Sequence, residues 1–425
     1  MPARACTRGL TRRTADAEEI HVLFESRDGR SYLIDPEGNA VKTWPYTGWP
    51  TEMIPPELNG GRKGHVFVLG SQDIHVPAPL LEVDWDGKIV WQWGPQGASG
   101  QNHDLVRLAN GNTLVISIVR HHVPGIRRRR PNPGHAGNAD ATTQLPEDLI
   151  DDQAILELTP GGDVIWQWLS CDHLAELGVD AVKRTEMSRP ELRPGTKGPL
   201  NINDLQPLGP NKWYEGGDKR FNPENLMIDS REANFIAILD RHTGDVRWRM
   251  GPDFPASYDH SKRAFRGPLP RPIDSLSGLH DAHLIPEGLP GAGNILLFDN
   301  QAPSGIPPVF QNILPATRVL EIDPMSQEIV WQYDAAMSDQ NVWDFYSAFA
   351  GSARRLNSGN TLICESMYGR IFQVTPDGNI AWEYVNPYEG KFTLHHESAG
   401  RSDSNWIYRA QPIQPEWLPL DDTTS

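Results

Sequence analysis

The chain has 425 residues, of which 38% are hydrophobic and 22% are charged, and its formal net charge is −16. Proteins that bind nucleic acid normally present a basic face, so this acidic balance argues against a nucleic-acid partner. The sequence contains no apolar run of about 18 residues, which argues against a membrane-spanning helix and a membrane partner. Its three cysteines are odd in number and widely spaced, so they predict neither a disulfide framework nor a cysteine zinc site.

The N-terminal segment is charged and lacks the apolar stretch of a secretory signal. We therefore expect a cytoplasmic protein, although a chain already trimmed of its signal would look the same. Residues 1–18 and 420–425 are predicted to be disordered ends, and residues 19–419 to form a single domain. A homodimer is one option that the sequence leaves open.

One strand pattern recurs six times along the chain. Each copy is a turn with Gly or an equivalent residue, followed by alternating apolar residues that end in Trp. The copies, in chain order, are 36–44, 86–91, 162–166, 244–248, 326–331 and 377–382. A further strand precedes each copy, as at 154–158 and 318–322, and strand, turn and strand together are typical of a β-hairpin.

A second hairpin pattern alternates with the first. Its copies begin near His103, Asn203, His280 and Ser352. One hairpin of each kind gives four strands, which is the size of a propeller blade, so the sequence predicts an all-β fold: a six-bladed β-propeller. The longer spacings between copies carry insertions at about 120–150, 172–200 and 250–277, and insertions on one face of a repeat fold usually build its binding face.

Polar residues stand where the innermost strand of each blade is predicted to begin, and these strand starts converge on the propeller axis. The candidates are His103, Asn201, Asn203, Asp204, His280, His283, Tyr346 and His395. Imidazole serves as base, acid, nucleophile or metal ligand near neutral pH. Arg409 is expected to close the last blade and is a candidate to reach the same site. The arginines at 127–130 are expected to form a solvated loop or, alternatively, to attract an anionic substrate.

The most distinctive stretch is 279–300, in which a strand containing His280 is followed by Asn-Ile-Leu-Leu-Phe-Asp-Asn. Together with 360–365, 369–378 and 405–410, it resembles the arylsulfotransferase family, and the resemblance extends over roughly residues 20–418. The resemblance implies a propeller enzyme that moves a sulfuryl group from one phenol to another without a nucleotide donor. It also implies a transiently sulfated histidine, a small phenolic or anionic substrate, and no cofactor.

Carried over by position, the resemblance makes His280 the nucleophile, His103 a histidine that assists proton transfer, and Arg231 the arginine that holds the sulfuryl oxygens. Asn203 would lie near the same group. The chain departs from the family pattern at Asn201 and Asp204. A carboxylate at Asp204 would suit a cation, a sugar hydroxyl or a proton shuttle better than a sulfate oxygen. The remaining substrate-binding candidates are Asn201, Asp204, His283, Tyr346, His395 and Arg409.

Other classes of function stay open. In a lyase or hydrolase acting on an anionic, glycosidic or phenolic substrate, a histidine would be the base and Tyr346 the acid, while Arg231 or the arginines at 127–130 would bind a carboxylate. In a variant of this alternative, His103, His280 and His395 would hold a divalent metal at the axis. A non-enzymatic ligand-binding propeller is the third class. A quinone-dependent dehydrogenase is disfavoured, since its typical eight blades and docking motifs are not seen.

Overall fold

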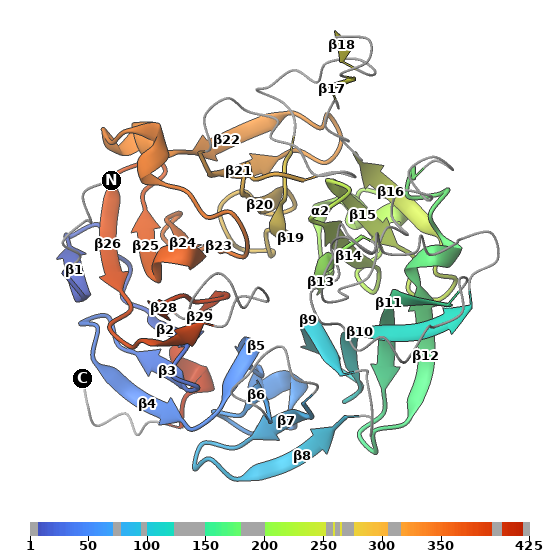
Figure 1. Cartoon of the computed structure of the whole chain (residues 1–425), viewed down its shortest axis with the longest axis horizontal. Coiled ribbons are helices and arrows are strands. Elements are labelled where there is room, and N and C mark those ends of the chain that lie inside the picture. Colours follow the sequence, from blue (N-terminus) through green and yellow to red (C-terminus); the bar gives the residue numbers. More distant parts are fainter. Residues whose placement is uncertain are drawn as a thin grey trace, which may run out of the picture.

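The computed structural model describes residues 7–70, 78–94, 100–122, 149–179, 200–251, 258–259, 264–265, 276–304, 316–392 and 402–419. Six sheets radiate from one axis in this part of the chain (Figure 1), which confirms the predicted six-bladed β-propeller. The only α-helix among the described residues is α2 (Lys212–Glu215). None of the described helices is long and apolar enough to cross a membrane.

Each blade is an antiparallel sheet whose first strand lies nearest the axis. Blade 1 contains β29 (Ala410–Ile413), β2 (His21–Glu25), β3 (Ser31–Ile34) and β4 (Ala40–Trp44). Blade 2 contains β5 (Thr47–Met53), β6 (Val66–Leu69), β7 (Leu80–Val83) and β8 (Ile89–Trp93). Blade 3 contains β9 (Gln101–Arg107), β10 (Thr113–His122), β11 (Leu149–Leu158) and β12 (Val164–Leu169).

The second half of the ring follows the same order. Blade 4 contains β13 (Ile202–Pro207), β14 (Leu226–Ser230), β15 (Phe235–Leu239) and β16 (Val246–Met250). Blade 5 contains β19 (His280–Leu284), β20 (Ile295–Asp299), β21 (Arg318–Ile322) and β22 (Ile329–Tyr333). Blade 6 contains β23 (Ser352–Arg355), β24 (Thr361–Glu365), β25 (Arg370–Val374) and β26 (Ile380–Val385).

Both ends of the chain close the ring. The late strand β29 forms the innermost strand of blade 1 by pairing with β2. At the other end, β1 (Gly9–Arg13) pairs with β26 and adds a fifth strand to blade 6. The sequence predicts a disordered segment at 1–18, whereas β1 is ordered because the open edge of β26 offers partners for its backbone N–H and C=O groups. Residues 1–6 and 420–425 lie outside the described part.

The tryptophans of the repeated pattern join each blade to the next. Their indole Nε1–H groups donate to a turn carbonyl of the following blade at 2.8–3.1 Å, in the pairs Trp44–Asp84, Trp91–Pro160, Trp168–Gly244, Trp248–Pro324, Trp331–Pro376 and Trp382–Pro36. The last pair joins blade 6 to blade 1, so this bond recurs at all six interfaces. In blade 3 the donor is Trp168, two residues beyond the Trp166 that ends the sequence pattern.

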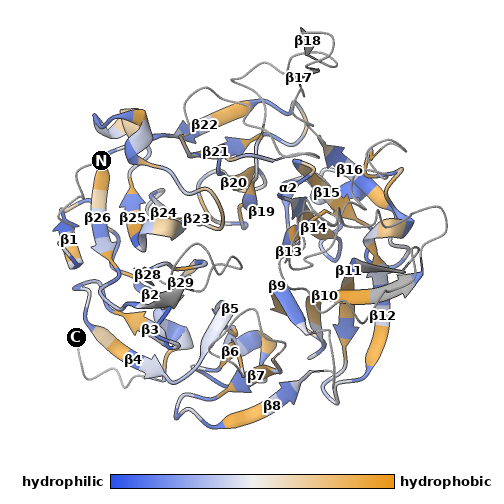
Figure 2. Ribbon diagram, viewed as in Figure 1, coloured by the Kyte–Doolittle hydropathy of each residue, from blue (hydrophilic) through white to orange (hydrophobic). Residues whose placement is uncertain are grey.

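Apolar residues also line some outer edges. Figure 2 shows hydrophobic colouring along the outermost strands β8, β12 and β22. Their exposed side chains are Ile89, Val90, Val164, Ile165, Ile329 and Val330. The corresponding Ile380 and Ala381 of β26 are buried, on the strand that β1 pairs with. Most of the three predicted insertions lie outside the described residues. The ends of the first one, at 120–122 and 149–150, belong to the long paired strands β10 and β11.

Candidate functional site

His280 begins β19, and partners at both ring nitrogens fix its imidazole. Nδ1 lies 2.7 Å from Asn300 Oδ1 and 3.0 Å from the carbonyl oxygen of Gly278. Both partners accept hydrogen bonds, so Nδ1 carries the ring hydrogen. Nε2 accepts the backbone N–H of Ala350 at 3.1 Å. Burial, assisted by the charge of Arg231, lowers the pKa of His280 to about 3, so the ring is neutral at physiological pH.

His103 is held in the opposite sense. Its Nδ1 accepts the indole N–H of Trp49 at 3.2 Å, so Nε2 carries the hydrogen and donates to Asn201 Oδ1 at 2.8 Å. The ring stacks on Trp49 and lies nearly parallel to Tyr408, with centroid distances of 5.9 and 6.3 Å. His103 and Asn201 both have positive φ, at 67° and 52°, which few residues other than glycine adopt.

Arg231 connects the surroundings of the two histidines. Its backbone N–H donates to the carbonyl oxygen of Asn201 at 3.1 Å, and Asn201 in turn contacts His103. Its guanidinium pairs with Glu232 at 3.1 Å and donates to the carbonyl oxygen of Ala348 at 3.1 Å. These contacts use two of the five N–H donors of an arginine. The side chain is 18% exposed, so it is not fully enclosed by the protein.

Asn203 and Tyr346 border the same region. Asn203 is buried and donates from Nδ2 to the carbonyl oxygen of Leu279 at 3.1 Å, next to His280. Its Oδ1 has no hydrogen-bond partner among the described residues. Tyr346 is half-buried, and burial raises the pKa of its phenol while nearby Arg231 partly offsets that rise. The structure therefore brings together His103, Asn201, Asn203, Arg231, His280 and Tyr346.

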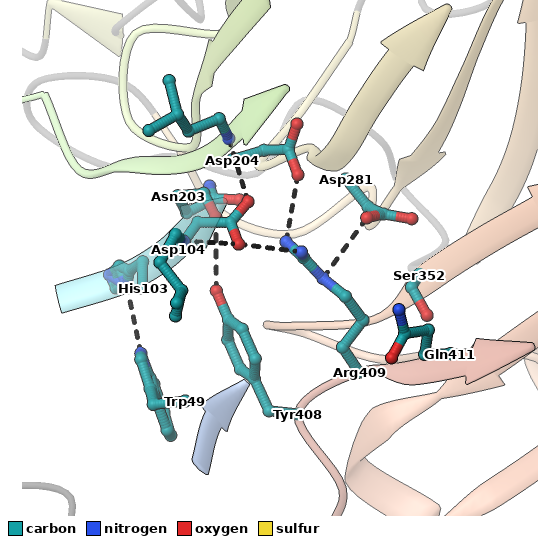
Figure 3. A network of polar contacts seen from close by, with 12 residues as sticks. Trp49, His103, Asp104, Asn203, Asp204, Asp281, Ser352, Tyr408, Arg409 and Gln411 are labelled. Atoms are coloured by element: carbon teal, nitrogen blue, oxygen red, sulfur yellow. Dashed lines mark hydrogen bonds and ion pairs between the residues drawn. The ribbon is translucent and has the colours of Figure 1, made fainter. Parts of the chain in front are cut away.

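Arg409 lies at the axis among three carboxylates. Its Nη1 is 3.1 Å from Asp104, its Nη2 is 3.0 Å from Asp204 and its Nε is 3.3 Å from Asp281 (Figure 3). These three aspartates are fully buried, and each directly follows a predicted site residue: His103, Asn203 and His280. The guanidinium is therefore surrounded by carboxylates of this chain.

Asp204 is part of this ion-paired cluster. Its second oxygen has no partner among the described residues. Burial, followed by the charge of Asp104, raises the pKa of Asp204 well above its ordinary value. Its partner across the β13–β14 pair, Asp229, is also buried and has a raised pKa. The departure from the family pattern at Asp204 thus coincides with a contact to Arg409.

Aromatic rings pack around His103. Trp49 stacks on Tyr408 with centroids 4.5 Å apart, and Trp406 lies 5.2 Å from Trp49. Phe349 lies 5.5 Å from Trp406 and directly precedes Ala350, whose N–H contacts His280. This aromatic cluster, formed by Trp49, Phe349, Trp406 and Tyr408, extends from one histidine to the other. Trp49, Trp406 and Tyr408 are buried, so the cluster packs around His103 and fixes the position of its ring.

The other predicted residues lie elsewhere. His283 is farther along β19, where Arg354 donates to its Nδ1 at 2.6 Å; burial and Arg354 lower the pKa of His283 well below its ordinary value. His395 and the arginines at 127–130 lie outside the described residues. In the part of the chain that is described, no group of three or more His, Cys, Asp or Glu side chains is arranged to hold a metal ion.

Sequence patterns missed several residues that shape the site. Asn300 fixes the hydrogen of His280, and its only sequence signal is its place at the end of the distinctive stretch 279–300. Ala350 acts through its backbone N–H, which no residue type reveals. Trp49 precedes Pro50 in a segment that matches neither repeated pattern, so nothing in the sequence marked its contact with His103.

A family model described as arylsulfotransferase (ASST) matches residues 135–387. The chain belongs to the arylsulfotransferase family. The matched range contains Asn201, Asn203, Arg231 and His280, whereas His103 precedes it and Arg409 follows it. Family membership supports an enzyme of the transferase type. No curated protein matches the chain significantly.

Similar solved structures are distant. A protein of unknown function from Bacteroides caccae is 11% identical, with 93% of this chain and 100% of that chain covered and a TM-score of 0.47. A quinohemoprotein alcohol dehydrogenase from Comamonas testosteroni is 13% identical over 86% of this chain and 66% of its own, with a TM-score of 0.35. Virginiamycin B lyase from Staphylococcus aureus is 11% identical over 79% and 69%, with a TM-score of 0.34. Likenesses this remote carry no argument about the reaction of this arylsulfotransferase-family chain.

Proposed function

We propose that the protein is an aryl sulfotransferase that needs no nucleotide and works through a sulfated His280. The observation that carries this proposal is a buried, neutral imidazole beside an arginine. The pKa of His280 lies near 3, so its unprotonated Nε2 keeps a lone pair at physiological pH. Only a neutral imidazole can attack sulfur, and a guanidinium nearby can bind the anionic group that carries it.

In the first half-reaction, the Nε2 lone pair of His280 forms a bond to sulfur while the bond from sulfur to the donor phenol oxygen breaks. The phenolate leaves with that electron pair. The hydrogen bond from His103 Nε2 to Asn201 Oδ1 opens, and this N–H donates to the phenolate before the phenolate takes a proton from solvent. Negative charge on the sulfuryl oxygens is stabilised by Arg231. Asn300 and Gly278 keep the hydrogen of His280 on Nδ1 throughout.

Attack by Nε2 requires a local change at His280 as well. The lone pair of Nε2 is occupied by the N–H of Ala350, so that hydrogen bond must open before sulfur approaches. Ala350 has a φ of 54° and is followed by Gly351 with a φ of 119°, and a backbone in these regions is held by its surroundings. We propose that the bound aryl sulfate displaces this N–H from Nε2.

In the second half-reaction, an acceptor phenol loses its proton and its oxygen attacks the sulfur. The bond between His280 Nε2 and sulfur then breaks, the aryl sulfate product leaves, and His280 returns to its neutral state. Because donor and acceptor are both phenols, they would occupy the same place in turn. The cycle consumes no cofactor and returns every proton that it takes from solvent.

Intact-protein mass spectrometry after incubation with a chromogenic aryl sulfate tests this proposal. We expect a mass increase of about 80 Da on His280, the mass of one transferred sulfuryl group, together with released phenol. His280→Ala should lose both signals while keeping the fold. His65→Ala is the matched control, because His65 is also buried but contacts Glu82. Near-native turnover of His280→Ala would exclude His280 as the nucleophile.

Arg231→Ala tests the role of the arginine. Loss of a donor that stabilises developing charge lowers kcat by about 100- to 1000-fold. Arg231→Lys should recover only part of that loss, since an ammonium group cannot bind two oxygens in the forked geometry of a guanidinium. A rise in KM with unchanged kcat would instead show that Arg231 binds the ground state only.

A further inference from the structure

We propose that Arg409 is a positioning residue that holds both histidines of the site in place, rather than a residue that touches the substrate. The kinetic part of the test rests on the proposed function, whereas the contacts of Arg409 do not depend on it. The side chain is buried, and its three nitrogens meet the carboxylates of Asp104, Asp204 and Asp281 at 3.0–3.3 Å. An arginine enclosed by three carboxylates has little guanidinium surface left for an anionic substrate.

The three carboxylates transmit this hold to the site. Asp104 directly follows His103 in β9, and Asp281 directly follows His280 in β19. Displacement of either carboxylate moves the peptide unit that carries the neighbouring imidazole. The third carboxylate, Asp204, directly follows Asn203 in β13 and so fixes another predicted contact.

These backbones need such a hold. His103 has a φ of 67° and Asp281 a φ of 61°. Residues other than glycine keep positive φ values only where surrounding contacts over-determine them. The carboxylate of Asp281 forms ion pairs with Arg409 at 3.3 Å and Arg354 at 2.7 Å, and it accepts the N–H of Ala353 at 3.0 Å. The carboxylate of Asp104 pairs with Arg409 at 3.1 Å and accepts the N–H groups of Leu105 and Leu205, each at 2.9 Å.

Arg409 reaches the axis because the ring closes. It directly precedes β29, the strand that completes blade 1, and its neighbour Tyr408 lies parallel to His103 and donates to the carbonyl oxygen of Asn203 at 3.4 Å. Pairing of β29 with blade 1 therefore places the ring of Tyr408 beside His103. It also places the guanidinium of Arg409 between Asp104 and Asp281, which follow the two histidines. Closure of the propeller and completion of the site become one event.

The test compares Arg409→Met and Arg409→Lys with Arg107→Met. Arg107 is a matched control because its side chain is 7% exposed, as is that of Arg409, and it pairs with Glu82 at 2.6 Å near the end of β9. For each variant we would measure kcat and KM with an aryl sulfate donor, the thermal midpoint, and the imidazole signals of His103 and His280 in long-range ¹H–¹⁵N spectra.

Arg409→Met should lower kcat by up to about 100-fold with little change in KM, since misplaced reacting groups slow the chemical step. Its two imidazole signals should move, and Arg409→Lys should lie between it and the native protein. Arg107→Met should lose stability but keep kcat and both signals. A raised KM with unchanged kcat, or unmoved imidazole signals, would overturn the proposal.

Two further outcomes are separable. If Arg409→Met does not fold, Arg409→Lys carries the test with the same readouts, because it keeps a cation at the axis while losing the three-way contact. If the native protein transfers no sulfuryl group, the proposed function fails. The imidazole spectra still decide the positioning role, since they need no turnover.

Discussion

Asn300 is the residue through which the holding of His280 can be tested most directly. Its Oδ1 accepts the Nδ1 hydrogen of His280, and its Nδ2 donates to the carbonyl oxygens of Ser347 and Ala350 at 2.7 and 2.8 Å. Together with the carbonyl oxygen of Gly278, Asn300 thus keeps the hydrogen of His280 on Nδ1. It also ties down the segment whose N–H occupies the other nitrogen.

Asn300→Ala removes all three hydrogen bonds and leaves two buried carbonyl oxygens without a donor. A buried polar group that loses its partner costs about 1–3 kcal/mol, so the loss of both partners should lower the free energy of unfolding by roughly 2–6 kcal/mol. His280 would keep only the carbonyl oxygen of Gly278 as a partner for Nδ1. Losing an orienting bond worth about 1–3 kcal/mol corresponds to a roughly 5- to 150-fold lower kcat.

Asn300→Asp separates orientation from stability. A carboxylate still accepts the Nδ1 hydrogen of His280, and its charge should raise the pKa of the imidazole and make Nε2 a stronger nucleophile. The same carboxylate faces the carbonyl oxygens of Ser347 and Ala350 without a hydrogen to donate. We therefore expect Asn300→Asp to be about as unstable as Asn300→Ala but clearly more active.

Urea unfolding and steady-state kinetics at saturating donor, both at low temperature where all variants are folded, measure the two effects. Native-like kcat in Asn300→Ala would show that the orientation of His280 does not limit the reaction. Equal activity of the Ala and Asp variants would show that an acceptor at position 300 has no part in the reaction.

Two more predictions concern stability. Burial, followed by the carboxylate of Asp104, raises the pKa of Glu52 from 4.5 to about 8. Protonation of Glu52 therefore stabilises the folded state at low pH, and this contribution to the free energy of unfolding is lost as the pH rises through 8. Glu52→Gln should therefore raise the thermal midpoint at pH ~9 by the equivalent of up to about 5 kcal/mol and change it little at pH ~5; equal shifts at both would contradict the raised pKa. Trp382→Phe removes the 2.8 Å hydrogen bond from Nε1 to the carbonyl oxygen of Pro36. Urea unfolding should show that the free energy of unfolding falls by about 1–3 kcal/mol. An unchanged midpoint would mean that this bond between blades 6 and 1 does not stabilise the fold.

The fold could be predicted from the sequence because its signals are local and repeated. Alternating apolar residues, turn residues and a terminal Trp recur at every blade, and each copy reinforces the others. The failures involve contacts between distant segments: the pairing of β1 with β26 depends on an open strand edge, and the indole bond of Trp168 depends on which tryptophan meets the next turn. Neither is visible within one repeat.

The site was predictable in part for the same reason. Strand starts of a propeller converge, so His103, Asn203 and His280 could be expected near one another. Their hydrogen-bond partners could not be expected, because Asn300 and the N–H of Ala350 come from the far end of β20 and from a loop before blade 6. The partners of Arg409 were equally hidden, since ion pairing across the axis leaves no spacing in the chain.

The repeat also explains how one arginine comes to organise this axis. Asp104 in blade 3, Asp281 in blade 5 and Ser352 in blade 6 occupy the same position of their inner strands. The side chain of each accepts a backbone N–H from the inner strand of the following blade. The donors are Leu205 to Asp104 at 2.9 Å, Ala353 to Asp281 at 3.0 Å and Ala410 to Ser352 at 3.3 Å. Arg409 takes the matched position in blade 1. A ring built only of acceptors at this position would bury negative charge without compensation, and burying unpaired charge is costly. Arg409, which directly precedes the C-terminal strand β29, supplies the cation that offsets this charge. It also ties the strands that carry His103 and His280 to the strand that closes the ring, so stability at the axis and geometry at the site share the same contacts.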